Sequence, residues 1–107
     1  MSFRWPNKDP DEVLDYSVDW SRFLGAGTIS SVVWSVNNAS GVKTVITPTG
    51  TVNTLRSTSQ TISSDNKTAT IYLAGGTNNV QYTIFCQISD NTGNIAERSI
   101  KLKVRDK

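Results

Sequence analysis

Val80-Gln-Tyr-Thr-Ile-Phe-Cys-Gln-Ile88 places Val, Tyr, Ile, Cys and Ile at every second position, with Gln, Thr, Phe and Gln between them. Successive side chains of a β-strand point to opposite faces, so this stretch predicts a strand with one apolar face that a second layer must cover. A Gly-Gly reversal precedes it in Leu73-Ala-Gly-Gly-Thr77, and a turn cluster follows it in Asp90-Asn-Thr-Gly-Asn94. Gly and Asn tolerate the left-handed backbone of tight turns, so the sequence indicates an antiparallel sheet.

The rest of the chain repeats this pattern of short strands and turns. Strand-forming or alternating segments lie at 14–20, 32–36, 42–47, 69–73 and 98–105, and the weakest signal, at 49–64, predicts a loop and an irregular strand near 55–62. About seven strands at this spacing, without a long helix or an internal repeat, are typical of an immunoglobulin-like antiparallel β-sandwich. We therefore expect an all-β sandwich domain at 12–107 and an extended N-terminal arm at 1–11.

Three positions carry specific expectations for this fold. Ile29 is out of phase with the apolar row that follows it, which predicts a β-bulge. Trp34 is expected to fill the centre of the core. Tyr82 enters its strand just after a tight reversal, which favours a tyrosine corner, in which the hydroxyl bonds to nearby backbone.

Composition limits the possible partners and compartments. The chain has 107 residues, a net charge of +2 and only 19% charged residues, so neither nucleic acid nor a membrane is an expected partner. The N-terminus lacks the apolar run of a signal peptide, and no segment approaches the roughly 18 apolar residues of a membrane span. We expect the product to stay in the cytoplasm of the cell that makes it.

The sequence predicts no catalytic centre and no cofactor. Histidine is absent and Cys86 is the single cysteine, which removes the commonest general base, a Cys-His nucleophile and an intramolecular disulfide. A calcium site is an alternative reading of the acidic residues, but the spaced ligand loop of a calcium hand is missing, so solvated surface positions are favoured. The acidic residues of that alternative are Asp9, Asp11, Glu12, Asp15 and Asp19, with Asp65 or Asp90 from another loop.

Two surfaces remain as candidate contact sites. The arm carries large apolar residues outside the alternating strands, which could either pack under the sandwich or anchor a partner. Pro6 and Pro10 exclude a regular helix there. The last strand carries a basic row that is expected to face mostly outward and that could bind an anionic surface, although protection of a sheet edge is the favoured reading. These residues are Phe3, Trp5 and Pro6 in the arm, and Arg98, Lys101, Lys103 and Arg105 in the row.

Several parts of the chain form a more specific pattern together: Phe3-Arg-Trp-Pro-Asn-Lys-Asp-Pro-Asp-Glu-Val-Leu-Asp-Tyr-Ser-Val-Asp-Trp20, Ser31-Val-Val-Trp-Ser-Val36, Leu73-Ala-Gly-Gly-Thr77, Tyr82, and Glu97-Arg-Ser99 to Val104. With these segments the chain resembles small tailed-bacteriophage virion proteins of the fiber-tail adaptor or neck accessory type. The resemblance implies a non-catalytic structural protein, assembled in the host cytoplasm and present in several copies at the head-neck-tail region of the virion. It also implies docking on other virion proteins. The expected docking residues are Phe3, Trp5, Pro6, Asp9, Asp11 and Glu12, followed by Arg98, Lys101, Lys103 and Arg105 on the last strand.

A second function class stays open at this point. Immunoglobulin-like domains also serve as binding modules for cell-surface glycan or protein, and one sandwich hosts many functions. A sugar site would need an exposed aromatic side chain with polar neighbours. Tyr72 and Phe85 are the strand residues that could supply it, although packing on the second face or against a partner is the favoured reading for both.

Overall fold

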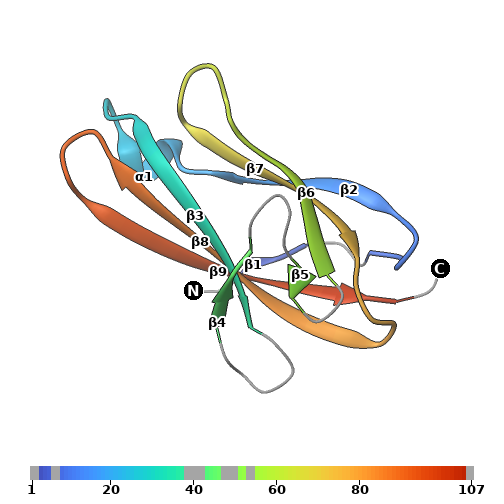
Figure 1. Cartoon of the computed structure of the whole chain (residues 1–107). Coiled ribbons are helices and arrows are strands. Elements are labelled where there is room, and N and C mark those ends of the chain that lie inside the picture. The colour runs from blue at the N-terminus through green and yellow to red at the C-terminus, as the bar shows by residue number, and fades with distance from the viewer. Residues whose placement is uncertain (1–2, 6–7, 38–42, 47–50, 53–54, 106–107) are drawn as a thin grey trace.

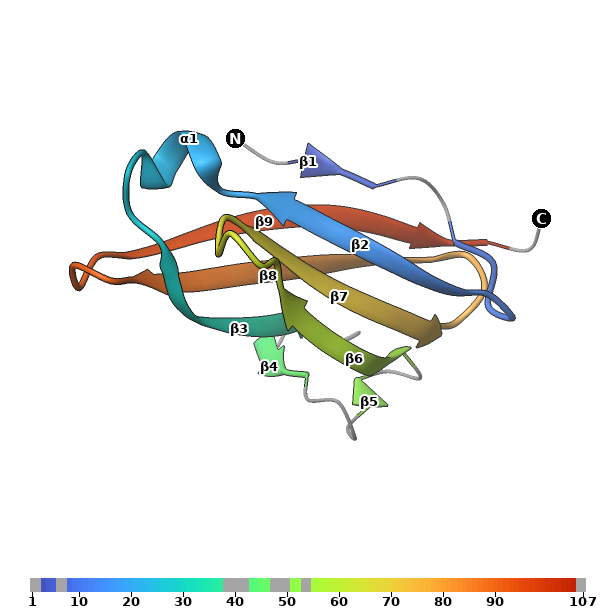
Figure 2. The same ribbon diagram turned by 90° about the horizontal axis from the view of Figure 1, so that it is seen from above.

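The stretch 80–88 lies in strand β8 (Val80–Asp90), the central strand of a five-stranded sheet with the order β1-β9-β8-β3-β4. A four-stranded sheet with the order β2-β7-β6-β5 covers its inner face (Figures 1 and 2). The computed structural model describes residues 3–5, 8–37, 43–46, 51–52 and 55–105. Its other elements are β1 (Phe3–Arg4), β2 (Val13–Asp19), α1 (Ser21–Leu24), β3 (Ile29–Asn37), β4 (Lys43–Val45), β5 (Thr51–Val52), β6 (Leu55–Ile62), β7 (Thr68–Gly75) and β9 (Ile95–Val104).

The prediction of an all-β sandwich is confirmed. Seven described strands remain when the two-residue strands β1 and β5 are set aside. The strand pairs are antiparallel except for β1 with β9, which is parallel. The one-turn helix α1 occupies part of the connection between β2 and β3. Within the part of the chain that the structure describes, no helix combines the length and apolar character that a membrane crossing requires.

The core lies between the two sheets and follows the alternation of the sequence. Trp34 is 1% exposed near its centre, as predicted. The inward positions of β8 are Tyr82, Ile84, Cys86 and Ile88, and each is at most 1% exposed. Burial raises the pKa of the Cys86 thiol to about 12, so this cysteine behaves as a small apolar side chain. The facing sheet contributes Tyr16, Val18, Leu55, Ala69, Ile71 and Leu73.

Irregular strands occur where the sequence pattern breaks. The β3–β8 ladder shifts register between Ile29 and Ser31, which confirms the bulge expected at Ile29. Strand β6 has the bounds predicted for the irregular strand, and its register with β7 shifts between Ser57 and Ser59. Strand β4 lies inside the predicted segment 42–47, whose end residues fall outside the described residues.

The tyrosine corner is present at the turn before β8. The backbone N–H of Thr77 donates a hydrogen bond to the hydroxyl of Tyr82 at 2.9 Å. Gly76 has a φ of +101°, and a Cβ built there would lie 2.7 Å from the Val104 side chain, so this position requires glycine. The turn that sets the start of β8 is therefore fixed both by backbone conformation and by the Tyr82 hydroxyl.

The N-terminal arm is extended, and its described residues run along the sandwich. Strand β1 pairs in parallel with β9, and the N–H of Trp5 donates to the carbonyl of Lys101 at 2.9 Å. The Trp5 ring stacks on Tyr16 with centroids 4.6 Å apart and lies 6.3 Å from the Trp34 ring. Of the two interpretations of the arm, packing against the sandwich therefore holds for Trp5. Pro6 and the side chain of Phe3 lie outside the described residues.

Candidate docking surface

Lys8 joins the arm to both sheets. Its backbone N–H donates to the carbonyl of Lys103 at 2.9 Å, and its carbonyl accepts from the N–H of Arg105 at 2.7 Å. Its side chain is fully buried, and Nζ donates to the carbonyls of Gly75 at 2.7 Å and Asp9 at 2.8 Å. Burial lowers the pKa of the Lys8 ammonium, while the carboxylates of Glu12 and Asp9 oppose that shift. The backbone is thereby fixed on β9 and the side chain on the end of β7.

The acidic residues that follow Lys8 form a closed turn. Oδ1 of Asp9 accepts the N–H of Asp11 at 2.8 Å, and Oε1 of Glu12 accepts the N–H of Asp9 at 2.8 Å. The N–H of Glu12 donates in turn to the carbonyl of Asp9 at 3.0 Å. Two of the three carboxylates therefore hold backbone N–H groups, as turn-forming acidic side chains commonly do. The Asp11 side chain is exposed and takes no part in these bonds.

The structure does not gather the acidic residues of the calcium alternative. Asp15 and Asp19 lie exposed on the outer face of β2. Asp65 and Asp90 lie in hairpins at the opposite end of the sandwich from the arm turn (Figure 1). The carboxylate of Asp90 accepts hydrogen bonds from the N–H groups of Thr92 and Asn94 and from both of their side chains. Among the described residues, no three Asp, Glu, Cys or His side chains lie where they could hold a metal ion.

Three members of the basic row share the outward face of β9. Lys101, Lys103 and Arg105 alternate with the buried residues Ile100, Leu102 and Val104. Nζ of Lys101 donates to Oγ1 of Thr83 on β8 at 3.1 Å, and Arg105 is exposed. Because the arm pairs with β9 along this stretch, these side chains do not protect an open edge here.

Arg98 differs from the other basic residues. It lies on the inward-facing side of β9, opposite Cys86, because its position has the same parity as the buried residues. Its guanidinium carbon lies 4.3 Å from the centroid of the Trp20 ring, and Nη1 donates to the carbonyl of Asp19 at 3.0 Å. Arg98 therefore covers the end of the core, and grouping it with the outward row was wrong.

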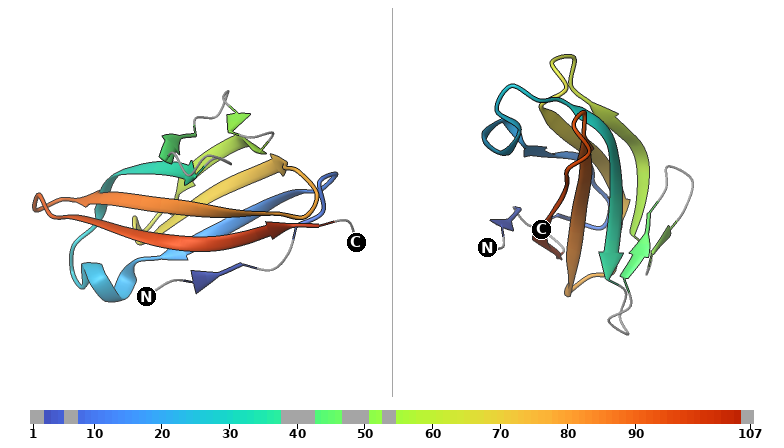
Figure 3. Two further views of the ribbon diagram at one scale, coloured as in Figure 1. Left: turned by 90° about the horizontal axis from the view of Figure 1, so that it is seen from below. Right: turned by 90° about the vertical axis from the view of Figure 1, so that its left-hand side faces the viewer.

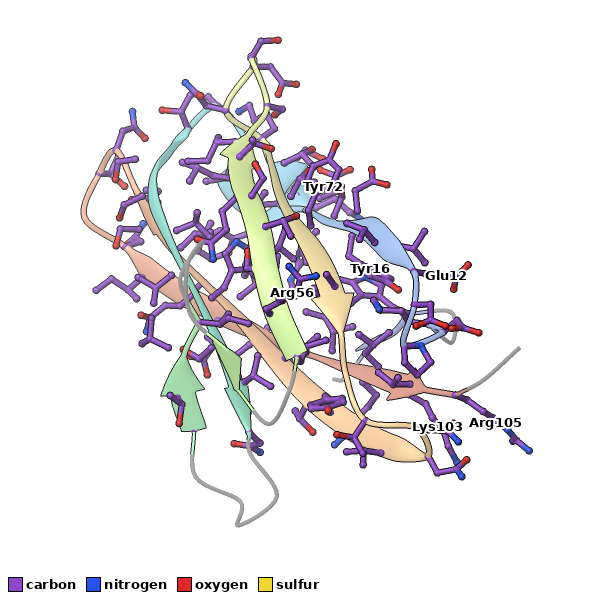
Figure 4. All side chains as sticks on the ribbon, turned by 45° about the vertical axis from the view of Figure 1, so that its right-hand side comes forward. Glu12, Tyr16, Arg56, Tyr72, Lys103 and Arg105 are labelled. Carbon is purple, nitrogen blue, oxygen red and sulfur yellow. The ribbon has the colours of Figure 1, made fainter. Side chains whose placement is uncertain are left out.

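The acidic turn and the basic end of β9 meet at one end of the molecule. Lys8 bridges to Val104, so Asp9 and Arg105 continue from paired positions. Figure 4 shows Glu12, Lys103 and Arg105 on the same side of the sandwich. We call this region the arm-end surface and define it by Asp9, Asp11, Glu12, Lys103 and Arg105. It presents charges of both signs on a backbone that is already ordered.

One feature of the surface, the buried side chain of Lys8, has no clear signal in the sequence. In the sequence, Lys8 looks like one more charged residue of a polar arm, because only the fold shows that its aliphatic stem enters the interior.

Tyr72 is 38% exposed on the outer face of β7, where its register partners are Asp15 on β2 and Ser59 on β6. Phe85 is half-buried, and Nζ of Lys43, which pairs with Glu97, lies 4.5 Å from its ring centroid.

The comparison with known families covers most of this structure. Residues 8–103 match the family model of the podophage GP4 fiber-tail adaptor protein gp77. The chain belongs to this fiber-tail adaptor family. Membership supports a structural role in the phage virion, in agreement with the resemblance of the sequence to such proteins. The matched range begins at Lys8 and ends at Lys103, so it holds nearly the whole sandwich and the residue that ties the arm to it. No curated protein matches the chain.

Proposed function

We propose that this member of the fiber-tail adaptor family works without catalysis and joins a fiber to the tail of a podophage particle through its arm and the adjoining end of β9. The observation that carries the proposal is the family match over residues 8–103. Its partners are other virion proteins, with several copies in the particle and neither nucleic acid nor membrane involved. The protein is assembled into the particle in the cytoplasm of the host.

The arm-end surface supplies the contacts in this proposal. Its acidic turn is closed by its own hydrogen bonds, and its basic residues extend from a paired strand, so a partner orders little chain on binding. Charges of both signs on an exposed surface give a partner orientation and specificity more than raw affinity. Trp5 and Lys8 act in support, because they fix the position of the arm on the sandwich.

The rival function, recognition of a cell-surface glycan or protein, has one observation in its favour. Tyr72 is an exposed aromatic side chain with Asp15 and Ser59 beside it in the sheet, which is the combination that a stacking sugar requires. It lies within the regular strand β7. A glycan array that gave a defined ligand abolished by Tyr72→Ala, while particles assembled normally without the protein, would support this rival.

The test of the main proposal uses a phage from which the gene is deleted and which is complemented from a plasmid. The double variant Asp11→Lys/Arg105→Glu exchanges two exposed charges, keeps the net charge, and leaves the backbone bonds of both residues in place. We expect wild-type protein to be present in purified particles, and the amount of the double variant in particles to be lower by about tenfold or more. Arg22→Glu, on α1 at the opposite end, is the matched control and should be incorporated normally. Incorporation of the double variant at the wild-type level would refute the arm-end surface as a docking site.

A further inference from the structure

The edge of the smaller sheet at β2 differs from the other sheet edges. The other edge strands that the structure describes are short, with two residues in β1, three in β4 and two in β5. Strand β2 pairs with β7 at seven consecutive positions without a shift. No strand pairs with the other side of β2 anywhere in the described ranges. Regular edge strands of this kind are the ones that accept a further strand.

The ladder shows which backbone groups of β2 point to the open side. The N–H of Trp20 donates to the carbonyl of Lys67, so position 20 is directed toward β7. Directions alternate along a strand, which places the N–H and C=O groups of Val13, Asp15, Ser17 and Asp19 on the side away from β7. Arg98 already bonds to the carbonyl of Asp19. Positions 13, 15 and 17 therefore offer the donors and acceptors that an added strand needs.

The two sheets end differently at this margin. The five-stranded sheet extends past β9 by strand β1, whereas the four-stranded sheet stops at β2. Trp5, which follows β1, stacks on Tyr16 of β2 and is only partly buried, so β1 and β2 flank the same side of the sandwich (Figure 3). A strand added to β2 would extend the shorter sheet, and its inward side chains would meet the part of Trp5 that is still exposed.

The side chains along this edge select the occupant. Asp15 and Asp19 are exposed on the outer face, and Val13 is 54% exposed beside them. A second copy paired in antiparallel fashion through its own β2 would bring carboxylates of the two copies together on one face, directly opposite each other in some registers and diagonally adjacent in the others. Like charges at such positions destabilise a strand pair. Basic side chains on a neighbouring strand would instead face these carboxylates at favourable distance.

We propose that the β2 edge accepts an extended segment of another virion protein, with Lys or Arg at alternate positions facing Asp15 and Asp19. This inference rests on the proposed function and names the form of one contact. Strand addition supplies affinity through main-chain hydrogen bonds and selects its partner through the alternating side chains. The β2 edge and the arm-end surface share no residue, so substitutions can separate them.

Ser17→Pro tests the role of the backbone at this edge. It removes an N–H that points away from β7, so the ladder stays complete, and proline is tolerated on an edge strand in that orientation. Ser17→Ala is the matched control, because it also loses the hydroxyl contact with Thr70 at 2.8 Å but keeps the N–H. Asp15→Lys tests the role of the negative charge. If circular dichroism shows that Ser17→Pro is unfolded, the binding of Asp15→Lys alone tests the inference.

The probe is purified phage particle that lacks the protein, and the readout is the amount of added protein that sediments with it. We expect Ser17→Ala to sediment with the particles in the same amount as wild type. The amounts of Ser17→Pro and Asp15→Lys that sediment should be lower by about tenfold or more. Folded Ser17→Pro and Asp15→Lys proteins that bind like wild type would overturn the inference and leave the proposed function standing. Failure of the wild-type protein to bind these particles would overturn the proposed function and this inference with it.

Discussion

Replacing Trp5 with alanine should destabilise the sandwich, because the ring is part of its packing. Trp5 is partly buried against the core, stacked on Tyr16 at 4.6 Å and tilted against Trp34 at 6.3 Å. Truncation of a fully buried Trp costs about 3–5 kcal/mol, of which a half-buried ring loses roughly half. The lost aromatic stacking adds about 0.5–1.5 kcal/mol. The expected loss is therefore about 2–4 kcal/mol, out of a total stability of about 5–15 kcal/mol for a domain.

Thermal unfolding followed by circular dichroism measures this effect directly. About 4–8 °C per kcal/mol applies to domains near this size, so Trp5→Ala should lower the Tm by about 8–30 °C. Urea unfolding should show a lower midpoint with a similar slope, since the surface exposed on unfolding changes little. Tyr72→Ala is the control, because Tyr72 is 38% exposed on an outer face and its loss should cost less than about 1 kcal/mol.

The outcome separates the two interpretations of the arm. A Tm within about 2 °C of wild type would show that the Trp5 ring contributes little to the packing. The ring would then be available as an anchor for a partner, and the position of the arm along β9 would need another explanation. A large fall in the Tm would instead make Trp5 a support for the docking surface, and loss of incorporation in such a variant would report on folding.

Three further predictions concern the fold and its protonation. Tyr82→Phe removes the acceptor for the N–H of Thr77 and should cost about 1–2 kcal/mol by urea unfolding, and an unchanged midpoint would argue against the corner. Burial tends to raise the pKa of the Asp90 carboxyl, but hydrogen bonds from Asn94 and the residues of its turn outweigh it and lower the pKa. The ionised Asp90 carboxylate therefore stabilises the fold above about pH 4, and this effect is lost as the pH falls through the folded-state pKa. The Tm of the wild-type protein should exceed that of Asp90→Asn by less in acid than at neutral pH, and a constant difference would contradict this. The buried Cys86 thiol, with its pKa raised to about 12, should react with a thiol reagent at neutral pH only at the rate of unfolding, and rapid labelling of the folded protein would contradict its burial.

The sequence predicted the sandwich because its strands alternate strongly and its turns carry Gly and Asn. The bulge at Ile29, the corner at Tyr82 and the burial of Trp34 follow from local pattern and appear in the structure. Arg98 shows where such reasoning failed. It lies at an even position like the buried residues of β9, whereas the other basic residues of the row lie at odd positions, so the two face opposite sides.

Tertiary features of the site lay beyond local pattern. Nothing near Lys8 in the sequence indicates that Gly75, on a strand of the other sheet, accepts its ammonium. The parallel pairing of the arm with β9 joins segments almost a whole chain length apart. For the same reason, the sequence could name charged residues at both termini but could not show that they meet at one end of the molecule.

The arm connects the two regions that we propose as contacts. It lies on β9 at Lys8, closes its turn through Asp9 and Glu12, and continues directly into β2. The arm-end surface and the β2 edge therefore flank one short segment whose backbone is fixed at both sides. If fiber and tail occupy one region each, the exchange of charge at Asp11 and Arg105 should abolish one contact and leave the other intact. Binding of separated fiber and tail fractions to the charge-exchange and Ser17→Pro variants would show which partner uses which region, and loss of both partners in either variant would mean that a single surface serves both.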